Sequence, residues 1–580
     1  MSSKHTSSTP HTSRIRLLAI LIILFCGLLI VRLFFLQVVK NQYYNDMADR
    51  QYLRPALNIF NRGDIFFTTK AGTLVSAATT KQGYIIAINP KIIKNATSTG
   101  EKLSSVFGQF DQVFDLEQFY LKANKKDDSY EEVANRVDEK IIDEILALNL
   151  KDILISKERW RYYPAGSAAS HVIGFMGYKG DLYTGRYGLE SFYNDILSRV
   201  NKQTFVNFFA EIYRGLSKNA TSSNSERAEG DIVLTIEPTV ENYLETTLIG
   251  TKEKYSADSI GGIVIDPSTG EIIAMASLPN FNPGEKQMDI NTLSNPMVED
   301  VYEMGSIVKA LTMAAALDSG AVTAETTYDD KGSLILNNRT ISNYDGRARG
   351  VVSMQEVLNQ SLNLGATFAM QQMGKDKFRR YFLDFGLGEK TNIDLPNEST
   401  GLVGTLNNNQ DIEFATASFG QGISVSPIAI TSALSALGNG GFLNSPHVVK
   451  EIRYQNGLRT EIKPAVRRQV LKKTTSEEIT RMLVVVVDTK LANGKAKLPH
   501  MSVAAKTGTA QMVDSSTKKY YDDRYLHSFF GYFPAYNPKF LVFLYIKYPK
   551  NVRYASETLT EPFMNMTKFL INYFSIPPDR

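Results

Sequence analysis

The order of strand and helix patterns after residue 230 constrains the fold most strongly. Residues 261–276 contain two β-like runs around an Asp-Pro-Ser-Thr-Gly turn, which indicates a hairpin. From about 305 the chain is rich in Ala and Leu and reads as helical, and after 500 apolar strand patterns return at 528–533 and 540–546. A last helix is expected at about 562–573. Strands, then helices, then strands predict an α+β domain in which helices flank an antiparallel sheet.

The composition bounds the possible functions. The chain has 580 residues and 43% hydrophobic content, enough for two or more domains with sizeable cores. A net charge of +4 without a long basic run argues against nucleic acid as a partner. The single cysteine and six scattered histidines show no ligand-like spacing, so we expect no metal and no other cofactor.

An apolar stretch near the N-terminus predicts a membrane anchor. Residues 17–31 are uncharged and apolar, Arg32 interrupts them, and residues 33–39 resume the pattern. Together they would cover roughly 35 Å at about 1.5 Å per residue, enough for a bilayer core. A cleaved signal peptide is the alternative, although no small-x-small cleavage site follows. Basic residues precede the span and no acidic residue occurs before Asp46, which favours a cytoplasmic N-terminus.

The region between the anchor and residue 230 has a mixed pattern. It combines short β-like runs, such as 84–88, with polar stretches that look helical, such as 130–148. Residues 217–230, rich in Ser, Asn, Ala and charge, predict an exposed loop. Residues 237–248 then predict a helix. This region holds no obvious catalytic cluster.

Ser306 and Lys309 open a segment, 307–317, that is apolar almost all round and predicts a buried helix. A spacing of three residues puts both side chains on one helix face, with Cβ atoms about 5–6 Å apart. A lysine desolvated by apolar neighbours has a lowered pKa and can act as a base toward the serine hydroxyl. The alternative is a helix cap whose lysine reaches solvent. The other Ser-x-x-Lys matches, 515–518 and 516–519, lie in a polar run typical of a solvated loop.

Two further motifs follow in the chain. Ser361-Leu-Asn363 lies between two helical patterns, so it is either a helix cap or a hydroxyl and amide directed into the same cleft. Lys506-Thr507-Gly508-Thr509 follows a short run of residues typical of a β-strand, so it is either an ordinary strand end or a substrate-binding edge. There the glycine would let a substrate strand approach the backbone. Motifs of these types, in this order, form the active-site set of serine acyl-transferases that cleave peptides or β-lactams.

On these motifs the chain resembles the class B penicillin-binding proteins, which are membrane-anchored peptidoglycan D,D-transpeptidases. The resemblance extends to 32–37, Arg62-Gly63-x-Ile65, 161–166, 171–174, Gly188-Leu189-Glu190, 266–271, Gly420-Gln-Gly422 with Pro427, and 439–441. The chain departs from the family at Met304, where proline is usual, and at Glu237 and Glu241, where Asp and Gln are more frequent.

The resemblance implies an architecture. An N-terminal transmembrane helix would precede an elongated, mostly-β pedestal domain and a penicillin-binding transpeptidase domain, the latter a β-lactamase-like antiparallel sheet flanked by helices. We place a cytoplasmic tail at 1–13, the anchor at 14–40, the dimerisation-like pedestal at 41–230 and the transpeptidase domain at 231–580.

The resemblance also implies roles for the motif residues. Ser306 would attack the penultimate D-Ala carbonyl and expel D-Ala, and a second stem peptide would then take the acyl group. Lys309 would be the base, Ser361 the proton relay and Asn363 the orienting amide. The backbone N–H groups of Ser306 and Thr509 would form the oxyanion hole. The predicted substrate-binding residues are Lys506, Thr507, Gly508 and Thr509.

The expected partners follow from the same family. They are peptidoglycan stem peptides, β-lactam antibiotics, the inner membrane, and a polytopic peptidoglycan glycosyltransferase with other divisome or elongasome proteins. The catalytic domain would lie outside the cytoplasm, and the division type is favoured over the elongation type. The alternatives are a D,D-carboxypeptidase, a β-lactamase-like hydrolase, or a non-catalytic β-lactam-binding scaffold or sensor.

Overall fold

The computed structural model describes residues 61–580 except 151, 181, 200–228, 286–287, 515 and 518, together with residues 21 and 24–29. Within this part of the chain, no helix combines the length and the apolar character needed to cross a bilayer. Most of the predicted anchor and of the loop predicted at 217–230 lie outside the described residues.

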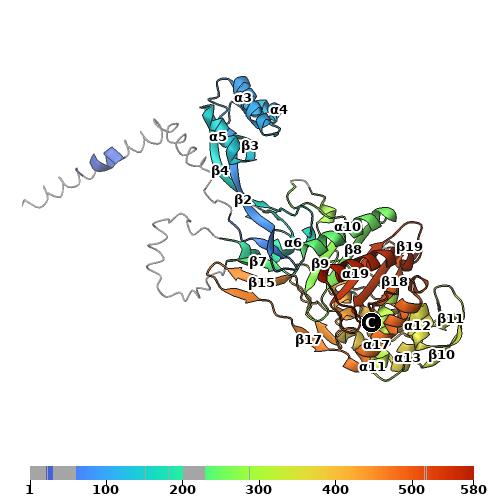
Figure 1. Ribbon diagram of the computed structural model, residues 1–580. Coiled ribbons are helices and arrows are strands. Elements are labelled where there is room, and N and C mark those ends of the chain that lie inside the picture. Colours follow the sequence, from blue (N-terminus) through green and yellow to red (C-terminus); the bar gives the residue numbers. More distant parts are fainter. Residues whose placement is uncertain are drawn as a thin grey trace, which may run out of the picture. The chain divides into compact units, whose positions relative to one another are not determined.

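The chain divides into two compact units, one made mainly of residues 82–160 and the other of residues 62–81 and 161–580 (Figure 1). In the smaller unit, the C-terminal part of β2 (Leu74–Ile88) pairs with β3 (Glu131–Val137), and β4 (Ile153–Tyr162) also pairs with β2. The helices are α3 (Ala96–Gln109), α4 (Leu116–Ala123) and α5 (Glu139–Ala147). Their apolar faces share one core with the strands, including Leu103, Phe119 and Ile141.

Two predictions for the pedestal region are wrong in part. The region predicted to be mostly β is mixed, because side-chain caps at Asn95 and Asp115 start α3 and α4. The stretch 130–148, predicted to be helical, begins with strand β3 and becomes helical only in α5. Its charged residues fit a helix locally, but pairing with β2 decides the conformation of the first half.

The larger unit contains a sheet that joins distant parts of the sequence. Its strand order is β16-β15-β7-β1-β2, in which only the β1–β7 pair is parallel. The strands are β1 (Ile65–Thr68), β7 (Gly230–Leu234), β15 (Val449–Tyr454), β16 (Arg459–Glu461) and the start of β2. Short elements follow along the chain: α6 (Ser170–Ile173), β5 (Met176–Lys179), β6 (Leu182–Gly185), α7 (Gly188–Phe192) and α8 (Asn194–Leu197).

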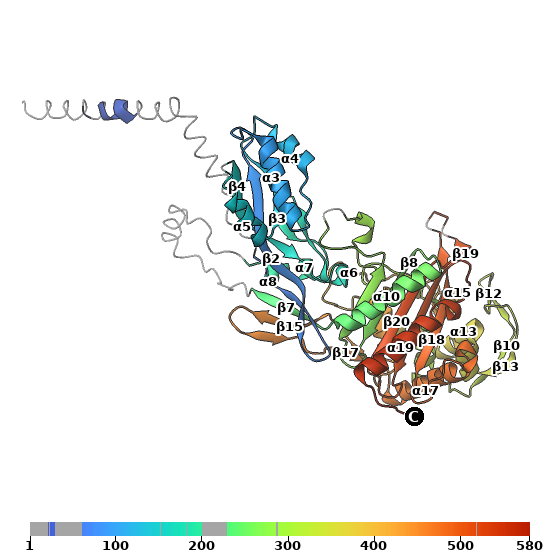
Figure 2. The same ribbon diagram turned by 45° about the horizontal axis from the view of Figure 1, so that its top comes forward.

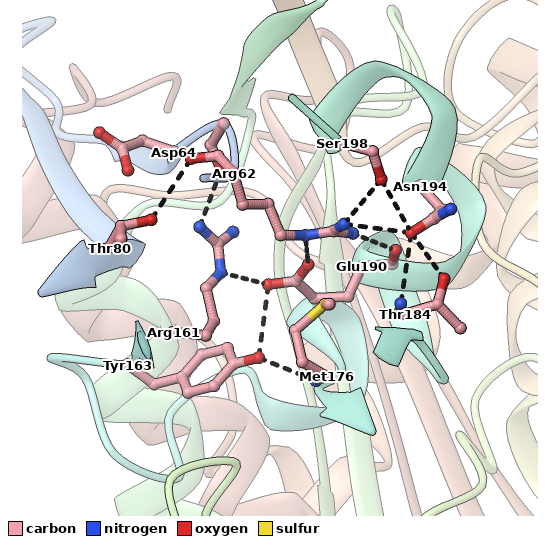
Figure 3. A network of polar contacts seen from close by, with 12 residues as sticks. Arg62, Asp64, Thr80, Arg161, Tyr163, Met176, Thr184, Glu190, Asn194 and Ser198 are labelled. Atoms are coloured by element: carbon pink, nitrogen blue, oxygen red, sulfur yellow. Dashed lines mark hydrogen bonds and ion pairs between the residues drawn. The ribbon is translucent and has the colours of Figure 1, made fainter. Parts of the chain in front are cut away.

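A buried ion cluster holds these elements together (Figure 3). Glu190 is fully buried, and its two carboxylate oxygens accept hydrogen bonds from Arg62 Nε at 2.5 Å and Arg161 Nε at 2.6 Å. Arg62 also donates to Asn194 Oδ1 at 3.1 Å. Burial alone would raise the pKa of Glu190, but the two guanidinium groups outweigh it and the pKa is lowered. Three residues that carry the family resemblance thus form one cluster.

A second sheet is the centre of the larger unit. It is fully antiparallel, with strand order β18-β19-β20-β8-β9. The strands are β8 (Ser259–Ile265), β9 (Ile272–Leu278), β18 (Ala504–Val513), β19 (Tyr520–Phe533) and β20 (Phe540–Lys547). Helices α10 (Pro238–Lys254) and α19 (Thr560–Phe574) lie side by side over it and share its apolar core (Figure 2). The predicted hairpin at 261–276, the last helix and the α+β fold with an antiparallel sheet are confirmed.

The remaining α-helices lie between residues 308 and 558. They are α11 (Val308–Asp318), α12 (Met354–Gln360), α13 (Asn363–Met373), α14 (Lys375–Asp384), α15 (Asp411–Ala417), α16 (Pro427–Ser435), α17 (Lys473–Thr489) and α18 (Ala555–Thr558). Short strand pairs accompany them: β10 (Thr327–Asp330) with β13 (Gly350–Ser353), β11 (Ser333–Leu336) with β12 (Arg339–Ser342), and β14 (Phe442–Asn444) with β17 (Val466–Gln469). Every residue of α11 from Val308 to Ala316 is buried, which confirms the predicted buried helix.

Candidate active site

Ser306 lies in a tight turn that leads directly into the buried helix. The 3₁₀ turn Gly305–Ile307 precedes α11, and Lys309 is the second residue of that helix. Lys309 is only 1% exposed, although it is a lysine. A buried lysine without a carboxylate partner is costly unless it gives up its charge.

Two separate segments hold this turn in place. Gly305 N donates to the carbonyl of Gly420 at 3.1 Å, and Ser528 Oγ donates to the carbonyl of Met304 at 2.7 Å. Gly420 has φ +81°, and a Cβ there would lie 2.2 Å from the Gly305 carbonyl oxygen. Only glycine allows this approach, so the Gly420-Gln-Gly422 motif supports the turn that carries Ser306.

The side chains of the two motif lysines, Lys309 and Lys506, both reach Ser361. Lys309 Nζ donates to the Ser361 carbonyl at 2.6 Å and to its Oγ at 3.3 Å. Lys506 Nζ donates to the same Oγ at 2.9 Å. Ser361 ends α12 with a left-handed backbone, φ +55°, and its backbone N–H, not its side chain, makes the capping bonds. Its hydroxyl is therefore available to both lysines.

Burial changes the protonation of both lysines. Burial lowers the pKa of Lys309 well below its ordinary value, and the neighbouring charge of Lys506 lowers it further. Burial lowers the pKa of Lys506 to about 7. A neutral amine on Lys309 can accept a proton, whereas an anion bound beside Lys506 would stabilise its charged form.

Asn363 is the first residue of α13, and its position is set by Asn343, a residue that no sequence motif singles out. Asn343 Oδ1 accepts from the backbone N–H groups of Asn363 at 3.0 Å and Leu364 at 3.3 Å, which caps the helix. Asn363 Nδ2 donates to the Ser342 carbonyl at 2.8 Å. Asn343 itself is held by Asp330 through bonds of 3.0 and 2.9 Å. Because Asn343 is twenty residues away in sequence, only the fold brings it to the motif.

The Lys506–Thr509 motif lies on β18, the edge strand next to the Ser306 turn. A Cβ at Gly508 would lie 2.7 Å from the Met304 carbonyl, 3.0 Å from Ile307 N and 2.4 Å from Ser528 Oγ. On that side the space that the glycine leaves is filled by the turn of the chain itself, where we expected a substrate strand. Gly508 thus brings β18 and the nucleophile turn into contact.

Six of the eight predicted site residues line one cleft of about 960 Å³. Its lining includes Ser306, Ser361, Asn363, Lys506, Thr507 and Thr509. Lys309 lies outside the lining but its Nζ reaches Ser361, and Gly508 faces the turn. The cleft also contains Gln421, Gln511, Tyr520, Arg553 and Tyr554, which the motifs do not single out. In the described residues, no group of three or more His, Cys, Asp or Glu could hold a metal ion.

Comparisons with known proteins cover both units. Residues 260–567 match the family described as "Penicillin binding protein transpeptidase domain", and residues 61–211 match "Penicillin-binding Protein dimerisation domain". Stage V sporulation protein D of Bacillus subtilis is 31% identical over 562 residues, which cover 95% of this chain and 84% of that protein. Peptidoglycan D,D-transpeptidase FtsI of Buchnera aphidicola subsp. Schizaphis graminum is 25% identical over 565 residues, covering 96% and 94%.

Solved structures share the fold. Penicillin Binding Protein 2X from Streptococcus thermophilus has a TM-score of 0.70 at 20% identity, covering 89% of this chain and 80% of that one. The apo form of penicillin binding protein 3 from Mycobacterium tuberculosis has a TM-score of 0.63 at 26% identity, covering 73% and 92%.

Proposed function

Because this chain belongs to the penicillin-binding protein transpeptidase family, we propose that it is a peptidoglycan D,D-transpeptidase that cross-links stem peptides through an acyl-enzyme on Ser306. The observation that carries the proposal is the convergence of Lys309 and Lys506 on Ser361, in the cleft that Ser306 lines. This is a nucleophile, a desolvated base and a relay hydroxyl in one place.

The first half-reaction would form the acyl-enzyme. Lys309, neutral because it is buried, takes the proton of the Ser306 hydroxyl, and Oγ forms a bond to the carbonyl carbon of the penultimate D-Ala. The backbone N–H groups of Ser306 and Thr509 receive the developing oxyanion. When the peptide bond breaks, the departing D-Ala amine receives a proton through Ser361, which both lysines contact.

Substrate binding would rely on the edge strand. Lys506, Thr507 and Thr509 offer a cation and two hydroxyls to the terminal carboxylate of the donor peptide. The bound carboxylate raises the pKa of Lys506 above its present value of about 7, so the lysine is charged when substrate is present. Gly508 contributes by position, since it seats the strand against the Ser306 turn.

The second half-reaction would transfer the acyl group. The amine of a neighbouring stem peptide attacks the ester carbon, its proton passes to Lys309 or Ser361, and Ser306 Oγ leaves with a proton restored. The products are a cross-linked peptide and free enzyme. A β-lactam presents the same carboxylate and a strained amide, so it acylates Ser306 and blocks the cleft.

The cellular setting is part of the same proposal. Residues 14–40 would anchor the protein as a single-pass inner-membrane protein, with the tail at 1–13 in the cytoplasm and the domains at 41–230 and 231–580 outside it. Its partners would be stem peptides, β-lactams, and a polytopic glycosyltransferase with other cell-wall proteins. The relatives called FtsI support the division type. A role in spore formation is the second candidate, supported by the 31% identity to Stage V sporulation protein D.

Labelling with a fluorescent penicillin tests the proposal. The wild-type full-length chain should be labelled covalently, Ser306→Ala should not be labelled, and Ser516→Ala, from a rejected Ser-x-x-Lys match, should behave as wild type. Incubation with a synthetic stem pentapeptide and an acceptor amine should then yield the cross-linked product and D-Ala. Labelling of Ser306→Ala at the wild-type level would overturn the catalytic assignment. Hydrolysed peptide without cross-linked product would favour a carboxypeptidase.

A further inference from the structure

Glu303 lies three residues before Ser306 and is a carboxylate that no motif includes. It is half-buried, and its Oε1 accepts from Gly422 N at 2.9 Å. The phenol of Tyr520 donates to the same carboxylate, 3.0 Å from each oxygen. One side chain thus joins the segment that leads to the nucleophile, the Gly420-Gln-Gly422 loop and the first residue of β19.

Tyr520 stands at the base of a hairpin. It pairs with Val513, the last residue of β18, and Asp514 N donates to the Lys519 carbonyl at 2.8 Å just beyond. Tyr520 is 42% exposed, so burial in an apolar core does not fix its side chain. Its hydroxyl donates to the Glu303 carboxylate and also interacts with the Gly422 backbone N–H, so the carboxylate and the loop together set its orientation.

The end of β18 and the start of β19 line part of the cleft. Gln421, Gln511 and Tyr520 line the same cleft as Ser306 and Thr509. Along β18, Gln511 follows Thr509 on the side away from Lys506. A donor with its carboxylate at Lys506 and its reactive carbonyl at Ser306 therefore extends its preceding residues toward Gln511 and Tyr520.

We propose that Glu303 and Tyr520 are a pair of positioning residues, which hold the end of β18 and the start of β19 against the nucleophile turn so that the part of the donor before the scissile bond is kept over Ser306. This inference rests on the proposed transpeptidase function. It concerns how the donor is held, since neither side chain is placed to exchange a proton with Ser306.

The chemistry of the contact explains why a carboxylate stands at this position. Hydrogen bonds to a charged acceptor are roughly twice as strong as neutral ones. Burial raises the pKa of Glu303, while the bonds from Gly422 and Tyr520 oppose that shift. A glutamine keeps one acceptor oxygen but turns an amide donor toward Gly422 N or the phenol, so Glu303→Gln loosens the pair at almost unchanged volume.

The test uses two β-lactams that differ only beyond the reactive core. Benzylpenicillin carries an acyl side chain that would extend toward Gln511 and Tyr520 in the proposed orientation, whereas 6-aminopenicillanic acid has the same core without it. Acylation of the full-length chain is followed for wild type, Glu303→Gln, Tyr520→Phe and the double variant. Tyr521→Phe is the matched control, because Tyr521 packs on Arg524 and lies outside the cleft lining.

Each single variant should acylate about tenfold more slowly with benzylpenicillin, within the range that small misplacements cost an enzyme. With 6-aminopenicillanic acid the rates should stay close to wild type. The double variant should resemble the single ones, since both substitutions break the same contact. Thermal unfolding should be unchanged, as should both acylation rates of Tyr521→Phe.

Three outcomes would overturn the inference: wild-type rates in the single variants, equal losses with both β-lactams, or additive losses in the double variant. Equal losses would indicate a general distortion of the nucleophile turn. Failure of the proposed function is distinguishable, because then wild type itself would show no Ser306-dependent acylation.

Discussion

A pair of buried glutamates on α10 should make the stability of the protein depend on pH. Glu241 is fully buried; its Oε2 accepts from Met275 N at 2.8 Å, and its Oε1 has no hydrogen-bond partner among the described residues. Glu245, one turn later, accepts from Ala169 N at 3.1 Å. Burial raises the pKa of Glu241 well above its ordinary value, and the charge of Glu245 adds to the effect. Burial raises the pKa of Glu245 to about 7.

The sign follows from proton binding. A carboxyl group with a raised pKa binds its proton more tightly in the folded than in the unfolded chain. Its contribution to the free energy of unfolding is therefore complete below the pKa of the unfolded chain, 4.5, and is lost as pH rises through the pKa of the folded chain. For Glu245 alone, the rise from 4.5 to about 7 corresponds to about 3 kcal/mol, at roughly 1.4 kcal/mol per pKa unit. Stability should therefore fall between about pH 5 and pH 8.

Glu241→Gln is the informative substitution. The amide oxygen can still accept from Met275 N, and the substitution removes one of the two titrating carboxyl groups of the pair. The free energy of unfolding of the full-length chain, measured by denaturant titration from pH 5 to pH 9, should fall less steeply for this variant than for wild type. At pH 8.5 the variant should be more stable than wild type because it lacks the buried Glu241 carboxylate, and at pH 5 the two should be nearly equal.

Glu253→Gln is the control, because Glu253 is exposed on the same helix. Its stability profile should follow wild type at every pH. The reasoning is refuted if Glu241→Gln keeps the wild-type slope, or if it loses the same amount of stability at pH 5 and pH 8.5.

Two further predictions concern close packing and buried charge. Gly508→Ala places a Cβ 2.7 Å from the Met304 carbonyl oxygen and should slow penicillin acylation by about 100-fold while the chain stays folded. Gly404→Ala, which has open space around it, should keep the wild-type rate. A wild-type rate in Gly508→Ala would contradict the role given to this contact. Glu190→Gln removes the carboxylate that pairs with the two buried guanidinium groups, and it should lower the free energy of unfolding by about 3–5 kcal/mol in the same denaturant titration. A loss below about 1 kcal/mol would show that the cluster contributes little to stability.

The parts of the fold that sequence predicts well are those whose local pattern and tertiary role agree. The apolar segment after Ser306 has no polar face to turn toward water, so its pattern predicts a helix that is buried on all sides. Helix α11 has this form. The stretch 130–148 shows the opposite case. Its charges suit a helix, but partners distant in sequence make its first half a strand.

The motifs identify the cleft residues, but not the contacts that hold them. Serine and lysine spacing points to Ser306, Lys309, Ser361 and Lys506. No local sequence pattern points to the roles of Asn343 and Glu303. Asn343 caps the helix of Asn363, and Glu303 holds Tyr520. Such residues act across tens or hundreds of positions, so their roles emerge only once the chain is folded.

The glycines around the nucleophile turn have a consequence for antibiotic resistance. Side chains at Gly420 and Gly508 would collide with the backbone at Gly305 and Met304, the two residues before Ser306. For the proposed enzyme, substitutions there would damage cross-linking and β-lactam reactivity together, and selection could not separate them. For such an enzyme, variants that evade the drug but still build wall are expected at cleft positions that make none of these contacts, such as Gln511.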